Sequence, residues 1–222
     1  MRSLGNPSVS EPAGARRKEM PFKSVITVSN ERLQVLSAAL IDLMHHRGFV
    51  PEAVVGIANG GVRVIEAMPK REGLIVWSCR LQRSSTEHMK QASIWRKVLR
   101  YLPYPLTNLL RVSEDWLRGL RDVTVPPPTA SLAEELGRIT AEIERRGIQR
   151  VAVIDDAADS GVTLACVMGC LRDGLPESVE LRSAVITATR GPERAAMSPD
   201  FSLFDRTLLR FPWSLDYKGS HG

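Results

Sequence analysis

The chain has 222 residues, of which 43% are hydrophobic and 25% charged, and its formal net charge is +5. This length suits one well-buried α/β domain with a small appendage, and no apolar run approaches the roughly 18 residues that span a bilayer. The positive charge suits an anionic ligand, but it suits nucleic acid or an acidic membrane surface equally well. Residues 1–10 lack the apolar core of a secretion signal, so we expect a cytoplasmic protein.

The first part of the chain divides into a tail and the start of a domain. Residues 1–20 are rich in Ser, Pro, Gly and charge, which predicts a disordered or loosely attached tail, and residues 21–222 are expected to form a single domain. Ser29 or Asn30 can cap a helix with one apolar face, which Gly48 ends. The apolar segment Ala53–Ile57 then predicts a strand.

A glycine pair follows this strand. The segment consists of Ala58, Asn59, Gly60 and Gly61, and a helix is expected over residues 62–68. Paired glycines permit the backbone to approach an anion closely, but a plain turn explains them as well. The next expected strand, Gly73–Cys79, leads into a polar, hydroxylated and basic stretch over residues 80–90, which could be a functional loop or equally a solvated surface loop.

Residues 91–121 predict a basic amphipathic helical hairpin. Two apolar helical stripes lie on either side of Pro103 and Pro105, and basic residues supply the polar side. Three explanations remain open: packing against the core or a sister subunit, binding to an anionic membrane surface, and binding to RNA or another partner. We assign no chemistry to this hairpin.

A further helix is expected after the stiff segment Val125–Pro128. Thr129 or Ser131 can cap it, it runs to about Arg146, and Gly147 terminates it. Four apolar residues share its inward face: Leu132, Leu136, Ile139 and Ile143.

The segment Val151–Leu164 combines an apolar strand, a cluster of acids and a hydroxyl-rich turn that precedes a helix. Gly161 permits close backbone approach, and the hydroxyls of Ser160 and Thr163 lie beside the positive end of the helix, so the turn suits a phosphate. Three nearby carboxylates make sense if the ligand also carries vicinal hydroxyls or a metal. The alternative is an ordinary capped helix, with Asp159 or Ser160 as the N-cap.

This segment resembles the phosphoribosyl-pyrophosphate (PRPP) motif of type I phosphoribosyltransferases. That motif is an apolar strand, two acids, two small or apolar residues, Asp, Thr or Ser, Gly, any residue and Thr; all of it is present, with Ser160 where Thr is commoner. Purine-type members are the nearest. The resemblance implies an α/β fold with a doubly wound, mainly parallel sheet, a hood over residues 190–222 and the hairpin at 91–121 as an insertion.

The resemblance also implies a reaction and roles for individual residues. The 5-phosphoribosyl group would pass from PRPP to a nitrogen of a purine-like or specialised heterocyclic base, with Mg2+ as cofactor and release of pyrophosphate. Asp155 and Asp156 would bind the ribose hydroxyls, directly or through Mg2+, and Asp159 is the candidate acid/base near the acceptor nitrogen. The 5-phosphate would be bound by the turn that consists of Ala157, Ala158, Ser160, Gly161, Val162 and Thr163. The pyrophosphate would be bound by Ala58, Asn59, Gly60 and Gly61. A mobile loop would carry Arg80, Arg83, Ser84 and Lys90.

The base-binding residues follow the strand predicted over residues 179–187. Thr189 stands where oxopurine enzymes carry a lysine, which argues against a standard hypoxanthine, guanine or xanthine substrate, and Arg190 comes next. In the hood, Phe211 and Trp213 are candidates to stack on a base, and Asp216 is a candidate ligand of the pyrophosphate metal. Core packing followed by a turn would explain these hood residues equally well.

Two other functions fit the same residues. A non-catalytic PRPP-sensing regulator or an RNA-binding protein on the same fold is favoured by the basic hairpin and the missing lysine, because fold does not fix function. Asp159 and the hood-like C-terminal segment favour catalysis. Hydrolysis or phosphorolysis of a ribosyl substrate is the other alternative. The expected partners are PRPP, a small heterocyclic base and further copies of the chain in a homo-oligomer.

Overall fold

The computed structural model describes residues 25–80, 103–104, 106–108 and 124–219. Its centre is a five-stranded sheet with the order β3-β2-β4-β5-β6, in which every neighbouring pair is parallel. The apolar parts of the central strands are fully buried, as a parallel sheet covered on both faces requires. The strands are β2 (Ala53–Ile57), β3 (Ile75–Cys79), β4 (Arg150–Ala158), β5 (Glu180–Ala188) and β6 (Phe201–Asp205).

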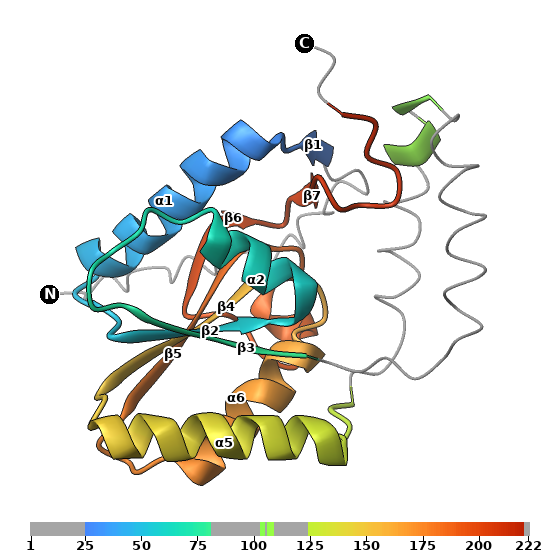
Figure 1. Cartoon of the computed structure of the whole chain (residues 1–222). Coiled ribbons are helices and arrows are strands. Elements are labelled where there is room, and N and C mark those ends of the chain that lie inside the picture. The colour runs from blue at the N-terminus through green and yellow to red at the C-terminus, as the bar shows by residue number, and fades with distance from the viewer. Residues whose placement is uncertain (1–24, 81–102, 105, 109–123, 220–222) are drawn as a thin grey trace, which may run out of the picture.

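Helices cover both faces of this sheet (Figure 1). α1 (Asn30–His46) and α2 (Ala58–Glu66) lie on one face, whereas α5 (Ala130–Arg146) and α6 (Val162–Gly174) lie on the other. Each face has its own apolar core, in which residues of the central strands pack against one helix pair or the other. The predicted doubly wound α/β class is therefore confirmed. A single 3-10 turn, η1 (Pro192–Arg194), precedes β6.

The capping residues expected from the sequence begin and end the helices where predicted. Ser29 Oγ accepts the N–H of Arg32 at 3.2 Å at the start of α1. Thr129 caps α5, and Gly147 follows that helix with a left-handed φ of +64°. The four apolar residues expected on the inward face of α5 are all buried.

α2, β4 and β6 differ from the sequence-based prediction. α2 begins at Ala58, so the segment expected as a glycine turn is the first turn of a helix. β4 continues through the acidic residues to Ala158, because its pairing with β5 extends that far. β6 was not predicted, since its five residues are mostly half-buried and show no clear alternation of buried and exposed positions.

A second, two-stranded sheet joins the two ends of the described chain. β1 (Val25–Thr27) pairs in parallel with β7 (Leu208–Arg210), and Figure 1 shows the two strands side by side beyond α1. The pairing continues past the strand end, where the N–H of Val28 donates to the carbonyl of Arg210 at 2.8 Å. The residues that follow β7 are thereby anchored to the main body.

The side chain of Arg210 is 1% exposed and lies at the centre of a polar cluster beside this small sheet. Its Nε donates to Asp216 Oδ2 at 2.8 Å, which makes a buried ion pair. Its Nη1 donates to Thr27 Oγ1 at 3.0 Å, so one guanidinium connects β1 with the C-terminal segment. We call Arg210 and its partners the Arg210 centre.

Helical residues at 104 and 106–108 complete the Arg210 centre. Nη2 of Arg210 donates to Thr107 Oγ1 at 3.0 Å and to Asn108 Oδ1 at 2.6 Å. The guanidinium also lies 4.3 Å from the centroid of the Tyr104 ring. This short part of the region between β3 and α5 is therefore held against the C-terminal segment by side-chain contacts.

Several predictions lie outside the described residues. They concern the tail at residues 1–20, most of the hairpin at residues 91–121, and the loop residues Arg83, Ser84 and Lys90. Across the parts of the chain that the structure describes, no helix combines the length and apolar character needed to cross a membrane.

Candidate functional site

The winding of the sheet reverses between β2 and β4. From β2 the chain continues to β3 on one side, and β4 is then added on the other side of β2. Such a switch point leaves a crevice outside the carboxyl ends of the two strands, where ligands bind in open α/β sheets. Residues 58–61 and 155–163, both singled out from the sequence, lie at these two strand ends.

The glycine pair allows the first turn of α2 to pack against the end of β4. A Cβ at Gly60 would overlap the carboxylate of Asp156, and a Cβ at Gly61 would overlap the carbonyl oxygen of Ile154. Ala58, which starts this turn, has a φ of +46°, a left-handed conformation that is uncommon for a residue with a side chain. The close backbone approach expected of the glycines is therefore made to β4, and their role toward pyrophosphate stays a prediction.

Asp155 and Asp156, the acidic pair, are half-buried at the end of β4. Asp155 Oδ1 accepts the N–H of Asp156 at 2.9 Å, and Asp156 Oδ1 accepts the N–H of Ala157 at 3.0 Å. Burial and the neighbouring Asp156 charge raise the pKa of Asp155 well above its ordinary value, and burial also raises the pKa of Asp156. Within the described ranges, no salt bridge joins either carboxylate to a basic side chain.

The indole of Trp213 reaches the acidic pair from the C-terminal segment. Its Nε1 donates to Asp156 Oδ2 at 2.9 Å. The ring stacks on Phe211, with centroids 4.9 Å apart and planes 4° apart, and the guanidinium of Arg63 in α2 lies 5.4 Å from its centroid. The sequence had suggested Trp213 for base stacking, and the bond to Asp156 was missed because a contact between such distant residues leaves no local signal.

Phe211 and Asp216 have contacts within the protein, and their roles toward a base and a metal stay predictions. Phe211 is 3% exposed and belongs to the core beneath α1 and α2, so the core-packing explanation applies to it. Asp216 forms its ion pair with Arg210 and therefore does not join the acidic pair as a third metal ligand. Among the described residues, no group of three or more His, Cys, Asp or Glu side chains is arranged to hold a metal ion.

The acidic pair nevertheless fits Mg2+ chemically. Magnesium prefers oxygen ligands and commonly binds a protein through one or two carboxylates, while water and substrate phosphates complete its shell. Asp155 and Asp156 offer two such carboxylates at the switch point. Their raised pKa values reflect a charge that the surrounding protein stabilises poorly, which a bound cation would relieve.

Asp159 is exposed at the start of the turn, and a buried hydroxyl orients it. Thr189 Oγ1 donates to Asp159 Oδ1 at 3.0 Å, and the N–H of Thr189 donates to the carbonyl of Ala158 at 3.0 Å. Thr189 is 2% exposed, so its hydroxyl is fixed by the packing at the end of β5. The sequence identified both residues but assigned no contact between them.

The turn after Asp159 leads into the first turn of α6. Gly161 is the N-cap of this helix with a φ of +68°, so neither Asp159 nor Ser160 occupies the N-cap position. A Cβ at Gly161 would also overlap the carbonyl of Met197. The first N–H groups of α6, at Val162 and Thr163, follow this glycine at the positive end of the helix, where anions bind favourably.

Three further residues predicted for the site follow the ends of strands in the main sheet. Asn59 is exposed in the first turn of α2, and Arg190 is half-buried directly after Thr189. Arg80 is exposed after β3, and its backbone N–H donates to Glu135 Oε2 at 2.9 Å.

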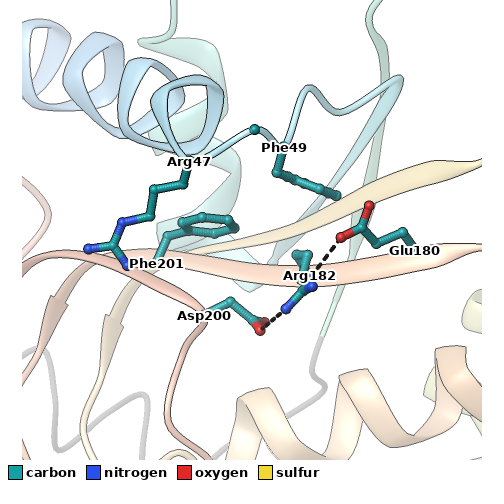
Figure 2. Close-up of a pocket in the computed structure, with 7 residues that line it drawn as sticks. Arg47, Phe49, Glu180, Arg182, Asp200 and Phe201 are labelled. Carbon is teal, nitrogen blue, oxygen red and sulfur yellow. Dashed lines mark hydrogen bonds and ion pairs between the residues drawn. The ribbon is translucent and has the colours of Figure 1, made fainter.

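A cavity of about 260 Å³ lies at the opposite end of the sheet, near the amino ends of β5 and β6. Figure 2 shows Arg182 between Glu180 and Asp200, with distances of 3.0 and 3.2 Å, while Arg47 extends past Phe201. The positive charge of Arg182 is therefore balanced by ion pairs with Glu180 and Asp200. None of the candidate site residues named from the sequence lines this cavity.

No protein-family model and no curated protein matches the sequence. Among solved structures, the chain is similar to a purine phosphoribosyltransferase from Pyrococcus horikoshii Ot3, with 15% identity, a TM-score of 0.46 and coverage of 86% of this chain and 94% of that chain. It is also similar to the xanthine-guanine-hypoxanthine phosphoribosyltransferase of Helicobacter pylori, with 16% identity, a TM-score of 0.47 and coverage of 86% of this chain and 93% of that chain. A hypothetical protein from Neisseria gonorrhoeae with bound ppGpp is similar at 14% identity and a TM-score of 0.49, with coverage of 86% of this chain and 90% of that chain. At these identities the similarity concerns the fold alone.

Proposed function

We propose that this protein binds PRPP and Mg2+ in the crevice between β2 and β4 and transfers the 5-phosphoribosyl group to a nitrogen of a heterocyclic base. The observation that supports this most directly is the convergence of the acidic pair, the oriented Asp159 carboxylate and the start of α6 at one switch point. PRPP carries a phosphate that suits the start of α6 and vicinal hydroxyls that suit the acidic pair, while its pyrophosphate would need the bound Mg2+.

In this proposal the acidic pair binds the sugar and the start of α6 binds its phosphate. Hydroxyl groups are donors, and Asp155 and Asp156 supply acceptors for them. The N–H groups at Val162 and Thr163 suit the three oxygens of a 5-phosphate, aided by the positive end of the helix. Bound Mg2+ would neutralise the charge of the leaving pyrophosphate, and Asp155 and Asp156 would be the protein ligands of this Mg2+.

Asp159 is the proposed acid/base group. It follows the acidic pair by three residues and precedes the phosphate turn, so it would lie near the reacting carbon of a ribose held between them. The Thr189 hydroxyl donates to Asp159 Oδ1 and so orients the carboxylate that would exchange a proton with the acceptor base. The acceptor is proposed only as a nitrogen heterocycle.

One observation favours a second function, PRPP sensing without turnover. Phe211 is enclosed in the core, and Trp213 is covered by Phe211 and Arg63, so both hood aromatics have partners within the protein. A base would have to displace Arg63 to stack on Trp213. A protein that binds PRPP but no base would not need such a ring.

Pyrophosphate release, measured with PRPP, Mg2+ and a panel of bases, tests the proposal. We expect release that depends on one base and falls at least about 100-fold in Asp159→Ala. Asp155→Ala/Asp156→Ala should abolish PRPP binding in calorimetry, whereas the control Asp42→Ala on α1 should leave it unchanged. Tight binding without turnover on any base would support the sensor, and unchanged PRPP affinity in the double variant would overturn both functions.

A further inference from the structure

We infer that Trp213 is a positioning residue for the acidic pair: its indole N–H holds the Asp156 carboxylate in the orientation that receives the sugar of PRPP. The inference rests on the proposed function and adds a residue from outside the strand and turn that carry the PRPP motif. It concerns a hydrogen bond between the C-terminal segment and the end of β4.

The Asp156 carboxylate is fixed at both of its oxygens. Oδ1 accepts the backbone N–H of Ala157 at 3.0 Å, and Oδ2 accepts the indole N–H of Trp213 at 2.9 Å. Two donors from different directions set the rotation of the carboxylate plane. The Asp155 side chain is a further hydrogen-bond partner of this carboxylate, so the two carboxyl groups are oriented together.

The chemistry of the donor matters as much as its position. An indole N–H donates one hydrogen bond and carries no net charge, so it orients Asp156 while leaving the negative charge uncompensated. A lysine or arginine in this place would form an ion pair and compete with a cationic ligand. The arrangement therefore fits a carboxylate that must bind something else.

Trp213 is itself held by two neighbours. Phe211, buried in the core, stacks on the indole ring with planes 4° apart, and Arg63 of α2 lies over the ring at 5.4 Å. The N–H of Phe211 donates to Ser214 Oγ at 3.0 Å, which fixes the backbone around the indole. α2 also packs against Asp156 through Gly60. The indole of Trp213 and the carboxylate of Asp156 therefore both contact α2.

The test compares Trp213→Phe with wild type in the full chain. Phenylalanine keeps the ring stacking and removes the N–H, so we expect folding to be retained and PRPP affinity in the presence of Mg2+ to fall about 10-fold to 100-fold. The KM for PRPP should rise by a similar factor, while kcat at saturating PRPP changes less than about threefold. Trp77→Phe, an indole replaced on β3, is the matched control and should leave both constants unchanged.

A spectroscopic measurement tests the bond without catalysis. The indole N–H resonance of Trp213, assigned by its loss in Trp213→Phe, should shift in Asp156→Asn and again when PRPP and Mg2+ are added. Unchanged PRPP affinity in Trp213→Phe, or a resonance that ignores Asp156→Asn, would overturn this inference while the proposed function stands. Absence of PRPP binding in the wild-type protein would instead overturn the proposed function.

Discussion

The acidic pair and the Arg210 centre both hold charge away from water, but their surroundings differ. Arg210 donates to four side chains, one of which, Asp216, carries the opposite charge at 2.8 Å. Asp155 and Asp156 receive hydrogen bonds from two backbone N–H groups and one indole, and they lie beside each other with like charges. Burial consequently raises the pKa of both carboxyls.

This difference separates a structural site from a functional one. A buried charge with a full set of partners stabilises a particular arrangement of segments. If one partner is removed, the remaining buried charge is not compensated and the protein is destabilised. A half-buried acidic pair without a cation is unfavourable in the free protein and becomes favourable when a ligand supplies the missing charge or donors. The comparison predicts that substitutions in the two places change stability in opposite directions.

The largest expected effect is at the Arg210 centre. Arg210→Met should lower the free energy of unfolding by about 3 to 5 kcal/mol, because the buried Asp216 carboxylate would lose its ion pair with Arg210. Arg182→Met is the matched control, since Arg182 also pairs with two acids but is 46% exposed, and its loss should cost no more than about 1 kcal/mol. Denaturant unfolding measures both, and similar losses for the two variants would contradict the comparison.

A steric substitution beside the acidic pair should have the next largest effect. Gly61→Ala places a methyl group against the carbonyl of Ile154 and should destabilise the protein by about 1 to 3 kcal/mol as α2 is pushed from β4. Gly137→Ala on α5 is the control, because a Cβ there meets no described atom within 4 Å and should add about 0.5 to 1 kcal/mol. Thermal unfolding with equal stability of the two variants would refute this packing argument.

A smaller effect is expected from the hydroxyl that orients Asp159. Thr189→Val keeps the shape of the side chain but removes its donor, and kcat for pyrophosphate release should fall about 10-fold, or about 1.4 kcal/mol. Thr187→Val provides the control, because that hydroxyl donates to the carbonyl of Thr207 at 2.7 Å, away from Asp159. Equal kcat values for both variants would show that Thr189 does not act through Asp159.

The smallest expected effect has the opposite sign. Asp155→Asn removes the charge that burial disfavours and should stabilise the protein at pH 7 by about 1 kcal/mol, while weakening PRPP binding. The folded-state pKa of Asp155 lies above its ordinary 3.8, so wild type loses stability as pH rises from about that value through the folded-state pKa. The advantage of the variant should therefore appear across this interval and be small at lower pH. A variant less stable than wild type at pH 7 would contradict it.

The sequence predicted those parts of the fold that have local signals. The apolar strand Ala53–Ile57 and the helix between Thr129 and Gly147 depend on residues close together in the chain, and both have the predicted bounds within one residue. The PRPP-like motif is also contiguous, which explains why the acidic pair and Gly161 could be singled out before any contact was known.

Contacts between distant segments were not predictable from these patterns. β1 and β7 have three residues each, too few to show a period, and their pairing depends on the rest of the sheet. Arg210 has the sequence signature of a surface residue, yet its partners come from Thr27, residues 107–108 and Asp216. The role of Trp213 toward Asp156 was missed for the same reason.

The pairing of β1 with β7 has a consequence for the order of assembly. Thr27 and Arg210 meet although 183 positions separate them, so the chain must close a very long loop before this small sheet can form. Local helices and the neighbouring strands of the main sheet can form earlier, because their contacts need shorter loops. We expect the segment that carries Trp213 to dock late in folding and to open first in hydrogen exchange, so that Asp156 gains its orienting donor only in the completed protein.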